Sequence, residues 1–382
     1  MLSDGAATTG VEELDQALGG LYWGDNVVWV CDGPDDELRE PFFRAIVQHR
    51  GDYGGAAYVA ARGELERVRR TYPGLAVIDA RPGSSLEDRG ALLAAIRRFC
   101  LASPQPLMIF DSLGVMAEQW GVGPASAFFA RCCPMLLDLG AIAYWSLPAS
   151  PRLRALADEI ERITQCIVVV HGDRLRIAKA EGRGPGVQGR LFRYSSSAEG
   201  VSLSESPAAA RVGAAIRAYR LRRDLSQTAM AKLAGVSPSA ISQAERGDRG
   251  LSLDTLLQLS TRLNVTLDEL LGGEISPDYR IRRRHTVWDL PTTTEVIPLL
   301  DDAEAGLRAY LVSLQPRSVA NAPFPHKGPE LAGVVTGLVQ VTIGPGRPVL
   351  RAGDVLLAAR RSITSWRNVG DTPALSYWVL RD

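Results

Sequence analysis

The segment from Leu225 to Gly247 constrains the fold most, because it contains two helix starts and one turn. A serine can cap each helix: Ser226 precedes the first helical pattern, and Ser237 precedes the second. Pro238 follows Ser237 at the first helical position, where proline is favoured. Between the helices, Gly235 can adopt the left-handed backbone conformation that turns the chain. The pattern predicts two short helices joined by a tight turn.

The second of these helices presents a polar outer face. Its apolar residues Ile241 and Ala244 are expected to face a core, which leaves short polar side chains outside. Short polar side chains at the start of a second helix are the type that read base edges in the major groove. We therefore predict a surface for double-stranded DNA. It comprises Ser226 and Gln227 on phosphates, Ser237 and Pro238 at the helix start, Ser239, Ser242 and Gln243 on bases, and Arg246 and Arg249 on the DNA backbone.

The residues around this motif extend the prediction to a whole domain. VGAAIRAYRLRRDLSQ begins the segment and LSLDTLLQLSTRLNVTLDELLGG ends it. About Arg211 to Gly273 resembles the five-helix DNA-binding domain of Cro and phage-repressor type regulators, the XRE family. This stretch holds nine Lys and Arg against six Asp and Glu, a net charge of +3, whereas the chain is neutral. The resemblance implies a DNA-binding domain at residues 208–273 with a local positive charge that suits phosphate contact.

Composition places the chain among ordinary globular proteins. Its 382 residues are 46% hydrophobic and 23% charged, which suggests two or three domains with their own cores. With no signal peptide and no apolar run of membrane-spanning length, we expect a cytoplasmic protein that does not bind a membrane. The cysteines have no metal-binding spacing and are expected to be small buried core residues. They are Cys31, Cys100, Cys132, Cys133 and Cys166.

Two segments are typical of linkers. Ser195 to Ala210 is rich in small and polar residues, and Gly272 to Arg284 ends in a cluster of arginines. The arginine cluster has two interpretations, a solvated linker or a basic segment lying along the DNA backbone.

Residues 1–203 alternate short apolar runs with amphipathic segments. Such alternation is typical of an α/β domain with a mostly parallel sheet covered on both faces. The expected strands are residues 27–30, 56–59, 75–78, 107–110, 142–145 and 167–170.

The opening TTGVEELDQALGG and the run LMIFDS resemble RecA-like ATPases of the KaiC type. The resemblance makes Asp111 the strand-end aspartate that organises Mg²⁺, and the later ADEIERITQCIVVVHGDRLRIAKAEGRGPG resembles that family's late strands and turn. However, the run Gly33 to Glu40 lacks the second glycine, the lysine and the hydroxyl that bind phosphates, and carries three consecutive acids. Ala61-Arg62-Gly63 and Glu64 stand where the family has an acidic catalytic pair. We therefore expect no ATP hydrolysis, and Asp111 either binds a metal or is a hydrogen-bonded strand-end residue.

From residue 279 to 382 the pattern changes to short strands separated by Gly and Pro, which predicts an antiparallel β-barrel. Strands are expected at residues 307–314, 331–335, 338–343, 354–359 and 374–380. PFPHKGPELAGVVTGLVQVTIG and LRAGDVLLAARRSITSWRNVGDTP resemble cupin motifs, whose ligands are three histidines and a glutamate. Only His326 and Glu330 are present, while Phe324 and Thr364 replace histidines, so no bound metal and no cofactor are expected.

The mouth of this barrel is a candidate pocket for a small-molecule effector. It would be lined by Phe324, His326, Glu330, Thr364 and Trp366. In a second interpretation, His326 and Glu330 only hydrogen-bond each other. Four basic residues could favour an acidic ligand or be solvated: Arg317, Lys327, Arg361 and Arg367.

Together these features predict a sequence-specific transcriptional regulator rather than an enzyme. Dimers or larger oligomers are expected because such domains read paired half-sites. In the resembling class of one-component regulators, the cupin senses a small molecule or pairs the subunits. Three alternatives stay open: an ATP-dependent regulator with a rescued nucleotide site, a cupin enzyme that regulates its own gene, and a structural adaptor.

Overall fold

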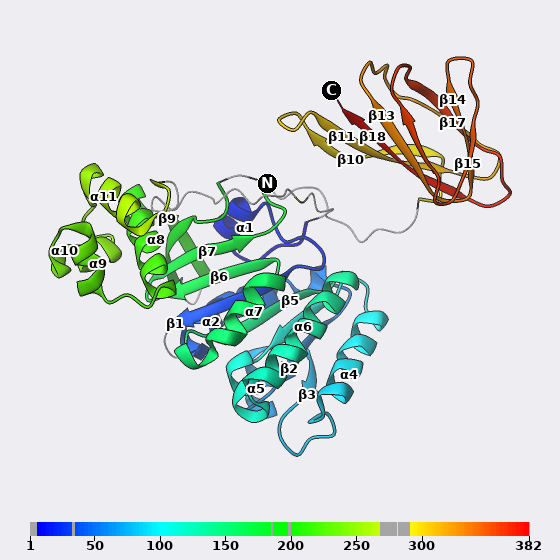
Figure 1. Ribbon diagram of the computed structural model, residues 1–382. Coiled ribbons are helices and arrows are strands. Elements are labelled where there is room, and N and C mark those ends of the chain that lie inside the picture. The colour runs from blue at the N-terminus through cyan, green and yellow to red at the C-terminus, as the bar shows by residue number, and fades with distance from the viewer. Residues whose placement is uncertain are drawn as a thin grey trace. The chain divides into compact units, whose positions relative to one another are not determined.

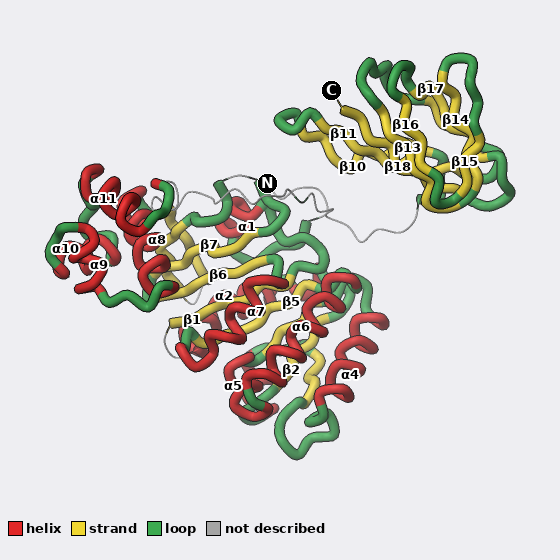
Figure 2. The backbone as a smooth tube through the Cα atoms, viewed as in Figure 1, coloured by secondary structure: helices red, strands yellow, loops and turns green. Residues whose placement is uncertain are grey.

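The computed structural model describes residues 6–32, 35–184, 186–197, 200–267, 281 and 291–381 (Figure 1). Two compact units divide the chain, Met1–Val287 and Trp288–Asp382. The first unit contains a parallel-sheet α/β domain and a helical region, and the second is an antiparallel β domain (Figure 2). This combination confirms the predicted fold class.

A nine-stranded sheet organises the α/β domain in the order β3-β2-β4-β5-β1-β6-β7-β8-β9. The first six of these strands pair in parallel, as predicted, and the last three extend the sheet antiparallel. The parallel strands are β1 (Asn26–Asp32), β2 (Ala56–Ala60), β3 (Ala76–Asp79), β4 (Leu107–Phe110), β5 (Ile142–Pro148) and β6 (Cys166–His171). The others are β7 (Arg174–Ala180), β8 (Leu191–Ser197) and β9 (Gly200–Glu205).

Helices cover both faces of this sheet, so a separate apolar core forms on each side. One face packs against α1 (Glu12–Leu18), α2 (Asp35–Gln48) and α3 (Leu65–Thr71). The opposite face packs against α4 (Arg89–Ala102), α5 (Leu113–Trp120), α6 (Val122–Asp138) and α7 (Arg154–Ile163). Short 3-10 turns occupy Arg50–Asp52 and Pro151–Leu153.

All five cysteines are buried in these two cores, which confirms the expectation that they are core residues. Burial raises the pKa of the Cys100 thiol to about 12 and that of Cys166 to about 11. Both thiols are therefore protonated at neutral pH and are poor nucleophiles.

The prediction of a linker at residues 195–210 is wrong. This segment contains the end of β8, all of β9 and the start of α8 (Ala208–Arg222). Its serines alternate with Val201 and Leu203, which pack into the core, and this period of two is that of a strand. Only Ser206 and Pro207 separate β9 from α8. The second predicted linker, residues 272–284, lies outside the described residues apart from Ile281.

Four described helices form the helical region: α8, α9 (Gln227–Ala234), α10 (Pro238–Glu245) and α11 (Leu253–Leu263). Their shared core includes Ile216, Met230, Ile241 and Leu259, all fully buried. The predicted fifth helix falls at residues outside those that the structure describes.

The second unit consists of two antiparallel sheets, ordered β10-β11-β18-β13-β16 and β12-β17-β14-β15. Trp366 and Trp378 pack edge to face in the core, with ring centroids 4.7 Å apart. The strands of the first sheet are β10 (Glu295–Asp302), β11 (Leu307–Leu314), β13 (Glu330–Thr336), β16 (Val355–Ala358) and β18 (Ala374–Arg381). Those of the second are β12 (Val319–Asn321), β14 (Leu338–Ile343), β15 (Val349–Arg351) and β17 (Ile363–Asn368).

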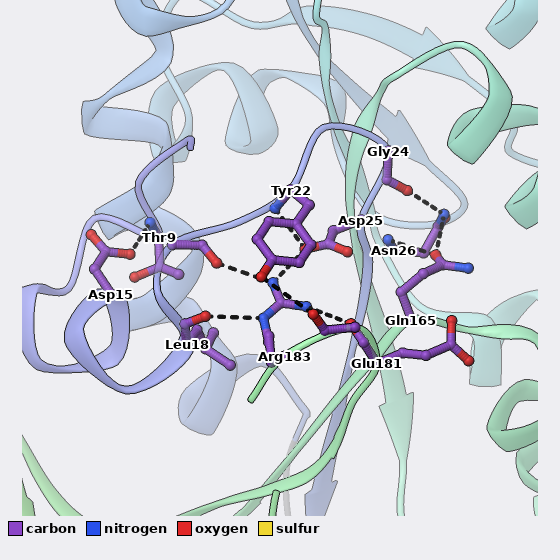
Figure 3. A network of polar contacts seen from close by, with 12 residues as sticks. Thr9, Asp15, Leu18, Tyr22, Gly24, Asp25, Asn26, Gln165, Glu181 and Arg183 are labelled. Carbon is purple, nitrogen blue, oxygen red and sulfur yellow. Dashed lines mark hydrogen bonds and ion pairs between the residues drawn. The ribbon is translucent and has the colours of Figure 1, made fainter. Parts of the chain in front are cut away.

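A buried polar network ties the start of the chain to the α/β sheet (Figure 3). At its centre the Arg183 guanidinium contacts an Asp25 carboxylate oxygen at 2.5 Å and donates to the carbonyls of Leu18 and Gly20. It also lies over the Tyr22 ring, 4.5 Å from the centroid. Arg183 belongs to the turn that resembles the KaiC type, and here its side chain is only 1% exposed. Each of these contacts of Arg183 lies within its own domain.

Candidate nucleic-acid interface

The predicted helix starts are present with their caps. The Ser226 hydroxyl accepts a hydrogen bond from the Ala229 backbone N–H at 3.0 Å, and that of Ser237 accepts one from Ala240 at 3.1 Å. Between the helices Gly235 has a φ of +67°, in the left-handed region that glycine tolerates best. Local sequence therefore determines where α9 ends and α10 begins.

A buried carboxylate, Glu245, holds α8, α9 and α10 together. Arg220 donates to both of its oxygens, at 2.6 and 2.9 Å, and the Gln227 side-chain amide donates at 2.9 Å. The Glu245 side chain is 3% exposed, and its hydrogen bond raises the pKa of Arg220. Sequence reasoning missed this group, although Glu245 lies four residues after Ile241 and thus on the buried face of α10.

Glu245 with its two partners, Arg220 and Gln227, is called the Glu245 clamp below. It affects Gln227, which we predicted to contact phosphates, because the side chain of Gln227 already has a partner within the domain. Its amide nitrogen is held by Glu245, so its position at the start of α9 is defined before any contact with DNA. Two other predicted contacts also interact within the domain. Arg246 donates to the Ser242 hydroxyl at 2.8 Å and contacts the Asp248 carboxylate at 2.7 Å.

The first turn of α10 is accessible, because Ser237, Pro238 and Ser239 are exposed. Ser242 and Gln243 are half-buried one turn further along the helix. The structure thus places most of the predicted set on one short helix and its flanks. The exposed members are Ser226, Ser237, Pro238, Ser239, Arg246 and Arg249.

A second cluster lies where the sequence resembles an ATPase. Asp111, which follows β4, accepts hydrogen bonds from the Tyr58 hydroxyl and the Arg62 backbone N–H, both at 3.2 Å. The Arg39 guanidinium contacts the same carboxylate at 3.3 Å, with both side chains buried. Burial, together with the Asp111 charge, raises the pKa of Tyr58. Of the two interpretations of Asp111, the hydrogen-bonded strand-end residue fits this geometry.

Arg39 occupies the position in the Gly33 to Glu40 run where an active phosphate loop has its lysine. Gly33 and Pro34 lie outside the described residues, and α2 begins directly after them. A cavity of about 280 Å³ adjoins the Arg39–Asp111 pair. Its lining includes Arg39, Glu40, Tyr58, Arg62, Glu64, Arg67, Tyr72 and Asp111.

The third predicted site, in the β domain, is only partly assembled. Glu330 is fully buried, and one of its oxygens accepts from the Ile363 N–H and the Trp378 indole, both at 3.0 Å. Trp366 is buried beside them, and the half-buried Phe324 stacks on Trp378 at 5.7 Å. Thr364, by contrast, is exposed and donates to the Thr342 carbonyl.

The polar groups around Glu330 do not have the arrangement of a metal centre in the part of the chain that the structure describes. The His326 carbonyl accepts from the Ser362 hydroxyl. Among the described residues, no three His, Cys, Asp or Glu side chains gather as ligands of a metal ion would. The four basic residues considered for an acidic ligand are all exposed: Arg317, Lys327, Arg361 and Arg367.

Comparison with known families decides the nature of the helical region. Residues 216–270 match the family described as HTH_3, helix-turn-helix. This part of the chain is a helix-turn-helix domain. The match supports a DNA-binding transcriptional regulator, and it confirms the helix-turn-helix that the sequence predicted.

Three solved structures that match parts of the chain are the following. The cupin domain of an XRE family transcriptional regulator from Enterobacter cloacae is 19% identical, over 23% of this chain and 95% of that one, with a TM-score of 0.21. An HTH_3 family transcriptional regulator from Vibrio cholerae is 18% identical, over 46% and 97%, with a TM-score of 0.21. A KaiC-like protein from Pyrococcus horikoshii is 13% identical, over 52% and 98%, with a TM-score of 0.42.

No curated protein matches the chain. The described helices include none that is both long and apolar enough to cross a bilayer.

Proposed function

We propose that the protein is a cytoplasmic, sequence-specific transcriptional regulator that binds DNA as a dimer or larger oligomer. Its three parts would be an α/β domain at residues 1–203, the reading domain at 208–273 and a cupin-like domain at 279–382. The observation that carries the proposal is the accessible first turn of α10 on a framework held by the Glu245 clamp. A helix with a defined position and short polar side chains can discriminate base edges in the major groove.

Individual roles follow from this placement. Ser239, Ser242 and Gln243 would read bases from α10, while Arg249 would contact the DNA backbone. Because Arg246 already binds Ser242, binding of Arg246 to a phosphate would release that hydroxyl toward the bases. Gln227 would donate the second N–H of its side-chain amide to a phosphate, or exchange its Glu245 contact for a phosphate.

The test is binding of the full chain to DNA from upstream of its own gene, at several salt concentrations and against scrambled competitor. We expect Gln243→Ala to lose roughly 1–3 kcal/mol for the preferred sequence. Gln258→Ala is the matched control, because Gln258 is an exposed glutamine on α11 of the same domain. Equal affinity of the unmodified protein for every DNA would reject specific readout and leave only electrostatic binding.

For the α/β domain we propose a role that does not involve ATP hydrolysis. The support is the buried Arg39–Asp111 pair, in which a side-chain cation lies against the carboxylate that would organise Mg²⁺. We expect labelled ATP with Mg²⁺ to bind more weakly than about 0.1 mM, a limit equivalent to about −5.5 kcal/mol. Tighter binding, or turnover above that of an Asp111→Asn control, would favour the ATP-dependent alternative.

For the β domain we propose an effector-sensing or subunit-pairing role without a metal or other cofactor. Its core offers one buried carboxylate, Glu330, between aromatic rings rather than a cluster of ligands. Elemental analysis of protein purified without chelators tests this: near-stoichiometric Fe, Mn, Ni or Zn would favour the cupin-enzyme alternative.

A further inference from the structure

The outer face of the sheet β10-β11-β18-β13-β16 exposes a row of apolar side chains. Val355 and Leu357, on β16, are 65% and 66% exposed, and Leu331 and Tyr377 beside them are also exposed. The strand registers place these residues next to one another: Leu331 is opposite Leu357, and Gly333 lies between Val355 and Tyr377. Contiguous apolar surface of this kind marks an interaction site.

β16 is also the last strand of its sheet. Among the described residues it pairs with β13 alone. The Val334 N–H donates to the Asp354 carbonyl at 3.0 Å, so Asp354 points its backbone toward β13. Alternation along an antiparallel ladder then directs the N–H and C=O groups of Val355 and Leu357 to the open edge. An exposed apolar edge strand with unpaired backbone groups is a template for another strand.

The sequence of this edge is complementary to itself. Residues 354–360 comprise β16 and the residues that flank it. When this segment pairs antiparallel with the same segment of a second copy so that Leu357 lies opposite Leu357, Val355 lies opposite Ala359 and Asp354 opposite Arg360. Each strand then presents one carboxylate to one guanidinium, twice across a two-fold axis. Shifting the register by two residues places Asp354 opposite Ala358 and removes both charge pairs.

We propose that β16 is the surface through which two copies of this chain associate, by antiparallel pairing of β16 with β16 centred on Leu357. This inference deepens the proposed function, from which it takes the need for a dimer that presents two reading domains. Pairing satisfies the backbone groups of Val355 and Leu357 and continues the apolar row across both copies. The occupant of the edge is a second copy of the chain, because in this register apolar residues face apolar residues and each Asp354 faces an Arg360.

Disulfide trapping in the full chain tests the pairing and its register together. In a hydrogen-bonded antiparallel pair, opposite Cα atoms are about 5.5 Å apart, within the range of a disulfide. Leu357→Cys should therefore give a covalent dimer under mild oxidation. Val355→Cys is the matched control, with almost the same exposure on the same strand. In this register the two 355 positions lie four residues, or roughly 13 Å, apart, and cannot be bridged.

The native cysteines are all buried and do not compete in this assay. We expect at least tenfold faster dimer formation for Leu357→Cys than for Val355→Cys. Equal rates, or no dimer from Leu357→Cys at concentrations where the mass of the unmodified chain is that of a dimer, would overturn the proposal. The assay needs no DNA, so its failure leaves sequence-specific binding to be judged separately.

A charge exchange provides the second measurement. Arg360→Asp places a carboxylate opposite each Asp354, and we expect the dimer dissociation constant of this variant, measured by sedimentation, to rise at least tenfold. Asp354→Arg removes the contacts of Asp354 with the backbone N–H and the guanidinium of Arg351 in its own turn, as well as the cross-strand pair. The double variant shares that loss but restores opposite charges, so it should dimerise better than Asp354→Arg alone. A double variant no better than that single variant would reject the register.

Discussion

Asp111 of the α/β domain and Glu330 of the β domain are both buried carboxylates, but their hydrogen-bonding needs are satisfied in different ways. Asp111 of the α/β domain is held by the Arg39 cation, a tyrosine hydroxyl and a backbone N–H. Glu330 of the β domain is held by an indole and a backbone N–H, which are both neutral. Its second oxygen has no hydrogen-bond partner among the described residues.

The two sites differ in the charge of the groups that contact the carboxylate. At Asp111 the Arg39 guanidinium lies against the carboxylate, so the buried charge is neutralised within the chain. At Glu330 only neutral donors contact the carboxylate among the described residues, and its second oxygen is a buried acceptor between aromatic rings. The first carboxylate is thus paired with a cation, whereas the second is not paired with one in the part of the chain that the structure describes.

Removing the cation at the first site should have the largest effect. We expect Arg39→Met to destabilise the α/β domain by about 3 kcal/mol, because it leaves the buried Asp111 charge without its closest cation. All five cysteines lie in this domain, so the rate of thiol labelling in urea measures its unfolding alone. Arg67→Met, an exposed arginine of the same cavity, is the control. Equal stability of the two variants would show that the buried pair contributes nothing.

Removing the acceptor at the second site should have a smaller effect. Glu330→Leu leaves the Ile363 N–H and the Trp378 indole without their acceptor, and we expect a loss of about 2 kcal/mol. Glu330→Gln keeps an acceptor and removes an unpaired charge, so its stability should change by less than about 1 kcal/mol. Hydrogen exchange of peptides from β13 and β18 measures both. A larger loss for Glu330→Gln than for Glu330→Leu would mean that the negative charge itself is required.

The smallest effect concerns the tyrosine that contacts Asp111. Burial raises the pKa of Tyr58, so its folded pKa exceeds its unfolded value of about 10. The associated stability is complete below about pH 10 and is lost as the pH rises further, because unfolding then releases a proton. The free energy of unfolding should fall between pH 9 and pH 11 in both proteins. We expect the fall to be smaller in Tyr58→Phe than in the unmodified protein, by about 1 kcal/mol. Identical pH profiles in urea titrations would show that Tyr58 does not contribute.

Local signals in the sequence were sufficient for much of the fold. The caps at Ser226 and Ser237, the apolar runs of the six parallel strands and the turns of the β domain all depend on near neighbours. Segment 195–210 was misjudged because small polar residues outweighed the alternation of Val201 and Leu203. Alternating residues form a strand only when a neighbouring strand pairs with them and a core packs against their apolar side chains.

The candidate sites likewise divide into features that local sequence spacing predicts and features that only the folded chain decides. Ser239 and Gln243 could be placed on one helix from spacing alone, since helix periodicity determines which residues share a face. That Gln227 would be held by Glu245 could not be predicted, because α8, α9 and α10 meet only in the folded domain. Thr364 was placed in the barrel pocket by its motif position, yet it faces solvent in the irregular pairing of β14 and β17.

The sequence by itself determined the element types, the helix-turn-helix and the incomplete phosphate-loop and cupin ligand patterns, because these depend on residue identity and short-range spacing. Only the tertiary structure decided which charges are neutralised. Arg39 and Asp111 are 72 positions apart, and Glu330 and Trp378 are 48 apart. Whether a buried carboxylate contacts a cation or a neutral donor depends on how strands and helices that are distant in the sequence pack together. This long-range packing therefore decides whether the charge of the carboxylate is neutralised.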